Sequence, residues 1–187
     1  MYQAHLARSV LMDTSPFRRF TDAKLLAELM SYLPNASVVA EVATELDDAS
    51  KSKKNELLAE AIANFGWPKR VAGISGPTQL AEAKILVDIL KKAEPNKSHL
   101  GEVATILRAK QLKTQLVIMD DKEARRRGAR PRKVNTIATA TLAAEMIHRG
   151  ALTEEQGWSV FQISTLTTSY AHFEAALQRA ALPPTPF

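Results

Sequence analysis

The sequence predicts an α/β sandwich in which helices cover both faces of a central, mainly parallel sheet. Short apolar runs alternate along the chain with longer segments whose apolar residues recur at the spacing of a helix. The clearest run, residues 116–119 (LVIM), is fully apolar and bounded by polar residues, as in a buried parallel strand. Strands that alternate with helices form a parallel sheet, whose strand carboxyl ends lie along one edge.

Five short apolar runs are the expected strands. They lie at residues 10–12, 37–40, 71–74 and 116–119 and near Val134. The expected helices are the segments with helical apolar spacing. They lie at residues 17–33, 41–64, 80–90, 100–107 and 142–147. We expect one or two helices over 41–64, because the charged residues 51–54 can interrupt the pattern. Ser15 and Pro16 suit the first turn of the first helix, and Gly150 suits a helix C-terminus.

Residues 1–152 are expected to form the main domain, and residues 153–187 a helical extension packed on it. Thr153 with Gln156 three residues later has the pattern of a capping box, and a second helical pattern follows. The proline-rich tail, residues 183–186, cannot continue a helix.

The composition limits where this protein acts and which metals it can hold. A chain of 187 residues that is 45% hydrophobic fits one globular domain. It has no apolar run near the ~18 residues of a membrane span, and residues 1–9 lack a secretory signal, so we expect a cytoplasmic protein with no membrane contact. The absence of cysteine excludes disulfides, thiolate ligands and cysteine nucleophiles, which favours Mg²⁺ or Mn²⁺ held by carboxylates.

Acidic residues directly follow two of the expected strands. Asp13 ends the run 10–12, and Asp120 and Asp121 end the run 116–119. Ligands of parallel sheets bind at the edge where strand carboxyl ends meet, so these side chains are expected near one another. A single aspartate after a strand is more often a helix cap, and the interpretation therefore depends on their combination.

Four segments resemble the acidic motifs of the PIN-domain family. They are residues 10–15 (VLMDTS), 38–46 (VVAEVATEL), 100–104 (LGEVA) and 116–125 (LVIMDDKEAR). The resemblance covers about residues 9–152 and includes an L-x-x-E-x-x-x-R-G helix that ends at Gly150. It implies a metal-dependent ribonuclease with a PIN-like fold. The implied catalytic acids are Asp13, Glu45, Glu102 and Asp120, with Asp121 as an alternative to Asp120.

The resemblance also implies a role for each acid. Asp13 and Asp120 would bind Mg²⁺ or Mn²⁺ directly, and Glu45 and Glu102 would act through water or orient the nucleophile.

Three assignments stay open. Glu41 competes with Glu45, since both precede apolar helix positions, and Asp121 competes with Asp120. Ser15 and Thr139 are the expected hydrogen-bond partners of the ligands, although Ala138 stands where the family usually has glycine before its threonine.

The histidines give little support for metal binding. His5, His99, His148 and His172 show no metal-ligand spacing, and each is expected at the surface or partly buried.

One basic segment accounts for the positive charge of the chain. Residues 122–133 (KEARRRGARPRK) hold seven basic side chains and one acid, so seven minus one gives +6, against +5 for the whole chain. Such a local concentration of guanidinium groups predicts contact with phosphates. The expected RNA-binding residues are Arg125, Arg126, Arg127, Arg130, Arg132 and Lys133. Another path for RNA would run along Lys51, Lys53 and Lys54.

The leading functional hypothesis is an endoribonuclease that cuts single-stranded or loop RNA, as the resemblance implies, and that acts as the toxin of a toxin-antitoxin module. Its partners would be RNA and an antitoxin protein. The apolar residues beyond Gly150 would cover the core or form a homodimer or antitoxin-binding face. They are Trp158, Phe161, Tyr170, Phe173 and Leu177.

Two other functions remain as alternatives. A catalytically inactive PIN-fold module that binds RNA or a partner is disfavoured, because an acidic cluster repels phosphates. A phosphatase of the haloacid dehalogenase type would need an aspartate two residues after Asp13, where Ser15 stands.

Overall fold

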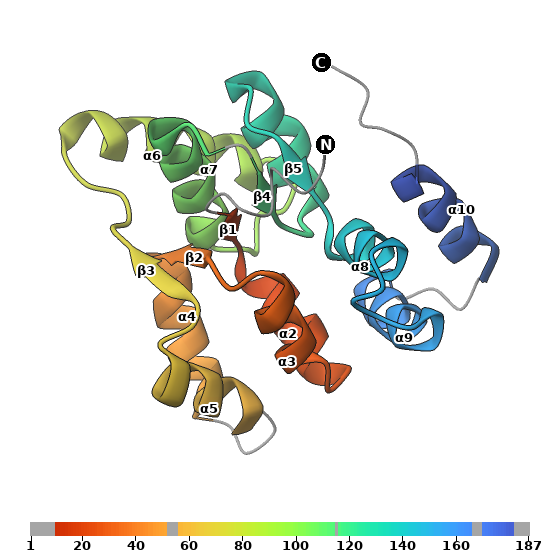
Figure 1. The fold of residues 1–187 in the computed structure, drawn as a ribbon. Helices are drawn as coiled ribbons and strands as arrows, with labels where there is room; N and C mark the ends of the chain where they lie inside the picture. The colour runs from red at the N-terminus through yellow and green to blue at the C-terminus, as the bar shows by residue number, and fades with distance from the viewer. Residues whose placement is uncertain (1–9, 52–55, 115, 166–169, 182–187) are drawn as a thin grey trace.

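A computed structural model of the chain describes residues 10–51, 56–114, 116–165 and 170–181 (Figure 1). Residues 1–9, Lys53, Lys54 and the proline-rich tail lie outside the described residues. Among those that are described, no helix is both long enough and apolar enough to cross a membrane.

Within the described residues, five parallel strands form one sheet in the order β3-β2-β1-β4-β5. The strands are β1 (Val10–Met12), β2 (Ala36–Val39), β3 (Lys69–Val71), β4 (Val117–Ile118) and β5 (Thr136–Ile137). The central strand β1 pairs with β2 on one side, where Val10 lies opposite Ala36, and with β4 on the other, where Leu11 lies opposite Val117. All residues of β1, β2 and β4 are buried. The expected parallel sheet is confirmed, with the third strand earlier than residues 71–74.

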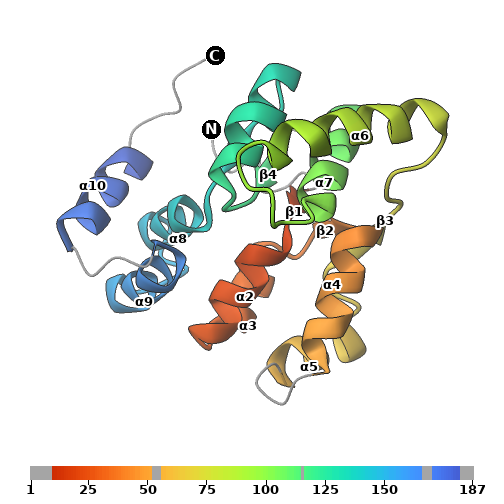
Figure 2. The ribbon, with the colours of Figure 1, turned by 180° about the vertical axis from the view of Figure 1, so that it is seen from behind.

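Helices cover both faces of this sheet, which confirms the sandwich (Figures 1 and 2). On one side lie α2 (Thr14–Asp22), α3 (Leu26–Tyr32), α4 (Ala40–Ser50) and α5 (Glu56–Phe65). On the other lie α6 (Pro77–Lys91), α7 (Leu100–Leu112), a π-helix (Ala124–Ala129) and a 3₁₀ turn (Arg130–Arg132). The central helix α7 packs against β1, β2 and β4. Its buried residues lie between Gly101 and Ala109, and its last turn is exposed.

The helical pattern over residues 17–33 forms two helices instead of the expected one. The backbone turns at Lys24, whose φ of 60° is left-handed. The N–H of Leu25 donates to the Phe20 carbonyl at 2.8 Å, and the N–H of Lys24 donates to the Thr21 carbonyl at 2.9 Å. These two bonds form a Schellman ending. Glycine usually occupies the left-handed position, and lysine at residue 24 gave no signal of the break.

The segment after β5 forms three helices. They are α8 (Thr139–His148), α9 (Glu154–Thr165) and α10 (Tyr170–Ala181). The turn after α8 uses Gly150 at φ 70°. The expected capping box is present, because Thr153 N–H donates to Gln156 Oε1 at 2.8 Å and Gln156 N–H donates to Thr153 Oγ1 at 3.2 Å. Both α9 and α10 pack against α8.

The aromatic residues of these last helices contact one another. The ring centroids of Trp158 and Phe173 are 5.2 Å apart, and those of Phe161 and Phe173 are 5.4 Å apart. Phe173 is fully buried, whereas Tyr170 is 44% exposed. The extension therefore has a small aromatic core of its own against α8.

Candidate active site

Asp13 lies at the carboxyl end of β1, where the strand passes into α2. Its backbone N–H donates to the Ile118 carbonyl of β4 at 2.9 Å, which fixes it at the centre of the sheet edge. The residue is only 4% exposed. The Ser15 hydroxyl donates to Asp13 Oδ2 at 3.3 Å, as expected for a residue that orients this carboxylate.

Glu45 reaches the same place from α4. The Thr14 hydroxyl, directly after Asp13, donates a short hydrogen bond to Glu45 Oε2. The N-terminus of α7 closes the group, because a Cβ added to Gly101 would lie 3.0 Å from Glu45 Oε1 and 3.6 Å from Asp13 Oδ1. Any larger residue at position 101 would push against the Glu45 carboxylate, so glycine allows α7 to approach it without displacing it.

Glu41, the competitor of Glu45, is held elsewhere. Its Oε1 accepts the Ile74 N–H at 2.9 Å, and an added Cβ on Gly73 would lie 2.1 Å from its Oε2. Glu41 therefore fastens the loop after β3. Of these two glutamates, Glu45 is the one that lies beside Asp13.

The electrostatics show that Glu102 and Asp121 belong to the same group as Asp13. Burial and the charges of Glu102 and Glu45 raise the pKa of Asp13 from 3.8 to about 7, although hydrogen bonds from Thr14 and Ser15 oppose the rise. Burial, with the charges of Asp121 and Glu45, also raises the pKa of Glu102. These carboxylates destabilise one another in their charged forms.

Asp120 and Asp121 point to different partners. Asp120 Oδ1 accepts the Thr139 N–H at 2.8 Å, and its Oδ2 lies 3.8 Å from Arg19 Nε. Asp121 Oδ1 accepts the Ala124 N–H at 2.7 Å. Asp120 thus joins the start of α8 to the site, with Thr139 as its partner, while Asp121 faces Glu102.

The donor set fits a hard divalent cation. Its side chains offer carboxylate oxygens, which Mg²⁺ and Mn²⁺ prefer. Asp120 Oδ2 is buried and has no hydrogen-bond partner among the described residues, so it is open to a further ligand. Burial first, and then the charges of Glu102 and Glu45, raise the pKa of Asp13, and a bound cation would offset both effects.

A family model described as a PIN domain matches residues 9–161. The chain belongs to the PIN-domain family. Members of this family are generally nucleases that use divalent metal ions. Neither the curated proteins nor the solved structures contain a significant match to the chain.

The basic segment of this PIN domain is divided between structural and exposed side chains. Arg125 Nη1 donates to the Met119 carbonyl at 2.7 Å, and Arg132 donates to Glu82 and to the Gly128 carbonyl, both at 3.1 Å. Arg126 and Arg127 share the carboxylate of Glu123.

Arg130 and Lys133 are exposed, and neither side chain forms an ion pair or hydrogen bond within the described part of the chain. In the alternative path, Lys51 pairs with Asp48 at 2.7 Å, and Lys53 and Lys54 lie outside the described residues.

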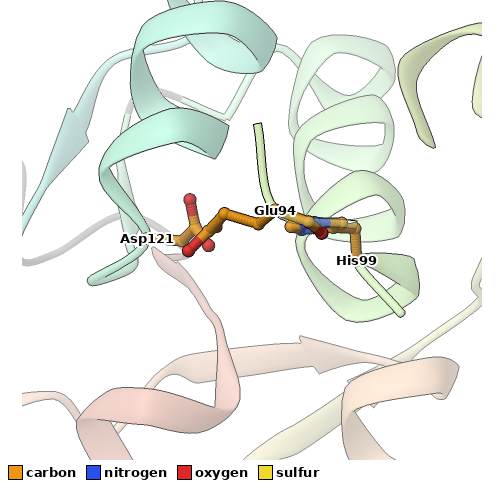
Figure 3. A group of neighbouring side chains, drawn as sticks. All are labelled: Glu94, His99 and Asp121. Atoms are coloured by element: carbon orange, nitrogen blue, oxygen red, sulfur yellow. The ribbon is translucent and has the colours of Figure 1, made fainter. Parts of the chain in front are cut away.

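A further group of polar side chains lies beside the acids of this PIN domain, and no motif in the sequence predicts it. Ligand atoms of Glu94, His99 and Asp121 lie within 4.8 Å of one another. In Figure 3, the carboxylates of Glu94 and Asp121 point toward each other, and the His99 ring lies beside Glu94. His99 is 2% exposed, so the expectation of a surface or partly buried side chain was wrong. The available signal was the charged loop Glu94–Leu100 between two helices.

Arg19 was also missed. It lies on α2, six residues after Asp13, and its Nε is buried without a hydrogen-bond partner among the described residues. Its spacing on α2 places it toward the sheet edge, where it partly balances Asp120.

Proposed function

We propose that this PIN domain is a metal-dependent endoribonuclease. The observation that supports the proposal most is a buried aspartate beside other carboxylates: burial, and then the charges of Glu102 and Glu45, raise the pKa of Asp13 to about 7. A cluster of this kind costs folding free energy unless a cation binds there, so it is expected only where the cation has a use.

Asp13 and Asp120 are the proposed direct ligands of Mg²⁺ or Mn²⁺, with Asp121 as the alternative to Asp120. When bound, such an ion supplies an activated water and neutralises charge on the scissile phosphate. Ser15 orients Asp13, and the Thr139 N–H with Arg19 orients Asp120.

Glu45 and Glu102 are proposed to act on water rather than as direct ligands. Thr14 fixes the Glu45 carboxylate through its hydroxyl. The raised pKa of Glu102, caused first by burial, suits a general base that accepts a proton from the attacking water.

The proposed RNA path runs over the exposed basic side chains that follow Asp121. Arg130 and Lys133 are available to phosphates, and Arg126 and Arg127 can exchange Glu123 for a phosphate, since guanidinium groups bind both bidentately. These contacts would position the strand without selecting bases.

The test is incubation of purified protein with mixed RNAs, with Mg²⁺, with Mn²⁺ or with EDTA, followed by sequencing of the cut ends. Asp13→Asn should abolish cleavage, whereas Asp22→Asn, an exposed aspartate on α2, should not. Comparison of Asp120→Asn with Asp121→Asn identifies the second ligand. Cleavage that persists in Asp13→Asn or in EDTA would refute the proposed site. RNA binding without cleavage under every condition would favour the inactive-module alternative.

The toxin role is the finer part of the proposal. It predicts that induced expression arrests bacterial growth and that Asp13→Asn removes the arrest while the protein still accumulates. Growth arrest of equal strength by both proteins would refute it. The proposed homodimer or antitoxin face on α9 and α10 is tested separately by light scattering with and without a candidate antitoxin.

A further inference from the structure

The group of Glu94, His99 and Asp121 lies on the loop between α6 and α7 and at the end of β4. Three potential ligand atoms, from one imidazole and two carboxylates, lie within 4.8 Å of one another. Zinc holds nitrogen and oxygen ligands at about 2.0–2.2 Å, so closing this group on an ion requires a shift of less than about 1 Å per ligand.

The His99 ring is prepared for a ligand. Its Nε2 lies 3.0 Å from the backbone oxygen of Glu94. A carbonyl oxygen only accepts hydrogen bonds, so this contact assigns the proton of a neutral ring to Nε2 and leaves a lone pair on Nδ1. Nδ1 is buried and has no hydrogen-bond partner within the described residues, in a side chain that is 2% exposed. A backbone carbonyl that fixes the other ring nitrogen is a common feature of metal-binding histidines.

The backbone holds this ring in the interior. His99 has a left-handed φ of 57° and is the residue before α7, and its carbonyl accepts the Val103 N–H at 3.0 Å. A left-handed non-glycine residue costs free energy, and such conformations concentrate at functional sites.

The ammonium group of Lys97 lies between the carboxylates of Glu94 and Asp121. Lys97 Nζ is 2.6 Å from Glu94 Oε1 and 3.3 Å from Asp121 Oδ2. The Lys97 side chain is 53% exposed, so it can withdraw into solvent without disturbing the core. The other carboxylate oxygen of Glu94, Oε2, is buried without a hydrogen-bond partner among the described residues.

We propose that Glu94, His99 and Asp121 form a second divalent-cation site, which adjoins the acidic group around Asp13 through Asp121 and selects Zn²⁺ over Mg²⁺. Imidazole nitrogen favours zinc and other transition metals, whereas sites of oxygen alone favour Mg²⁺. Lys97 is the competing cation that occupies this site in the absence of metal. Because Asp121 acts electrostatically on Glu102, an ion held here is linked to the acidic cluster.

The first test measures Zn²⁺ affinity of the full chain by calorimetry. Glu94→Gln removes a ligand and should weaken binding by about tenfold or more. Lys97→Gln removes the competing charge and should tighten binding by about tenfold. The two variants should therefore change the Zn²⁺ affinity in opposite directions. A simple ion-pair network would give no Zn²⁺ binding that depends on either residue.

The matched controls are Glu82→Gln and Lys110→Gln, an ion pair of 3.0 Å between α6 and α7. Neither should change the Zn²⁺ affinity. Asp13→Asn should also leave the Lys97-dependent binding in place, which distinguishes this site from the proposed nuclease centre.

The second test follows the imidazole directly. Long-range ¹H–¹⁵N NMR spectra of the unmodified chain should show a large shift of His99 Nδ1 with Zn²⁺ and no such shift with Mg²⁺, while His148 serves as the exposed reference. The proposal is overturned if His99 Nδ1 does not shift at saturating Zn²⁺, or if Glu94→Gln and Lys97→Gln bind Zn²⁺ as the unmodified chain does.

Discussion

Asp13→Asn should stabilise this protein at pH 8 in the absence of metal, and this gain should disappear at low pH. The pKa of Asp13 is raised from 3.8 to about 7, mainly by burial and then by the charge of Glu102. The folded state therefore binds more protons than the unfolded state between these two values. The contribution of Asp13 to the free energy of unfolding falls as the pH rises through this window, and it is at its lowest above the window.

The magnitude follows from the same shift. The rise of the Asp13 pKa from 3.8 to about 7 corresponds to about 4 kcal/mol of folding free energy, because each pKa unit is worth about 1.4 kcal/mol. Asparagine has no charge to bury, and its side-chain oxygen can still accept the Ser15 hydroxyl bond. For a domain of this size, we expect Asp13→Asn to raise the Tm by about 8 to 16 °C at pH 8, and by little at pH 4.

The assay is thermal unfolding followed by circular dichroism in EDTA at pH 4 and pH 8, with Asp22→Asn as the exposed control. Addition of Mn²⁺ at pH 8 should stabilise the unmodified protein and not Asp13→Asn, since only a ligand that binds the folded state raises the Tm. An Asp13→Asn gain that is equal at both pH values would refute the electrostatic reasoning.

Three further changes test other parts of the structure. Gly101→Ala places a Cβ 3.0 Å from Glu45 Oε1 and should displace this proposed catalytic carboxylate slightly, so cleavage should fall about tenfold while the Tm stays within a few degrees; full activity would contradict the close approach of α7. Arg130→Gln should lower the log-log salt slope of single-stranded RNA binding by about 0.7, measured on inactive protein. Arg132→Gln, whose guanidinium is held by the protein, should leave the slope unchanged, and equal slopes in both variants would move the RNA path elsewhere. Phe173→Ala should destabilise the protein by about 3–5 kcal/mol in denaturant titrations, and exposed His172→Ala by much less; equal effects would contradict the aromatic core of the extension.

Much of the fold could be predicted because β1, β4 and most of β2 lie in contiguous apolar runs with recognisable ends. In the run at 116–119, Val117, Ile118 and Met119 are fully buried, as expected for a strand covered on both faces of the sheet. The break at Lys24 could not be predicted, since its hydrogen bonds are backbone bonds and leave no signature in the side chain. The short third strand began two residues earlier than expected, because Lys69 and Arg70 are exposed at the sheet edge and do not form an apolar run.

The candidate site was predictable only as a set of residue types. Glu41 and Glu45 both precede apolar helix positions, and the tertiary contacts separate them: the Thr14 hydroxyl reaches Glu45, while the loop after β3 holds Glu41. No local pattern distinguishes Asp120 from Asp121, because adjacent residues after a strand turn to opposite sides.

The sequence by itself determined the sheet, the acids that follow its strands, and the concentration of arginine after Asp121, because these are local properties of consecutive residues. Only the tertiary structure decided which charged side chains face one another. Lys97, Glu94 and His99 meet Asp121 because α6 and α7 cross the sheet and return their connecting loop to the end of β4. Arg19 meets Asp120, about a hundred positions away along the chain, for a similar reason. Burial then sets the strength of each interaction, since the same carboxylate in water would keep its ordinary pKa.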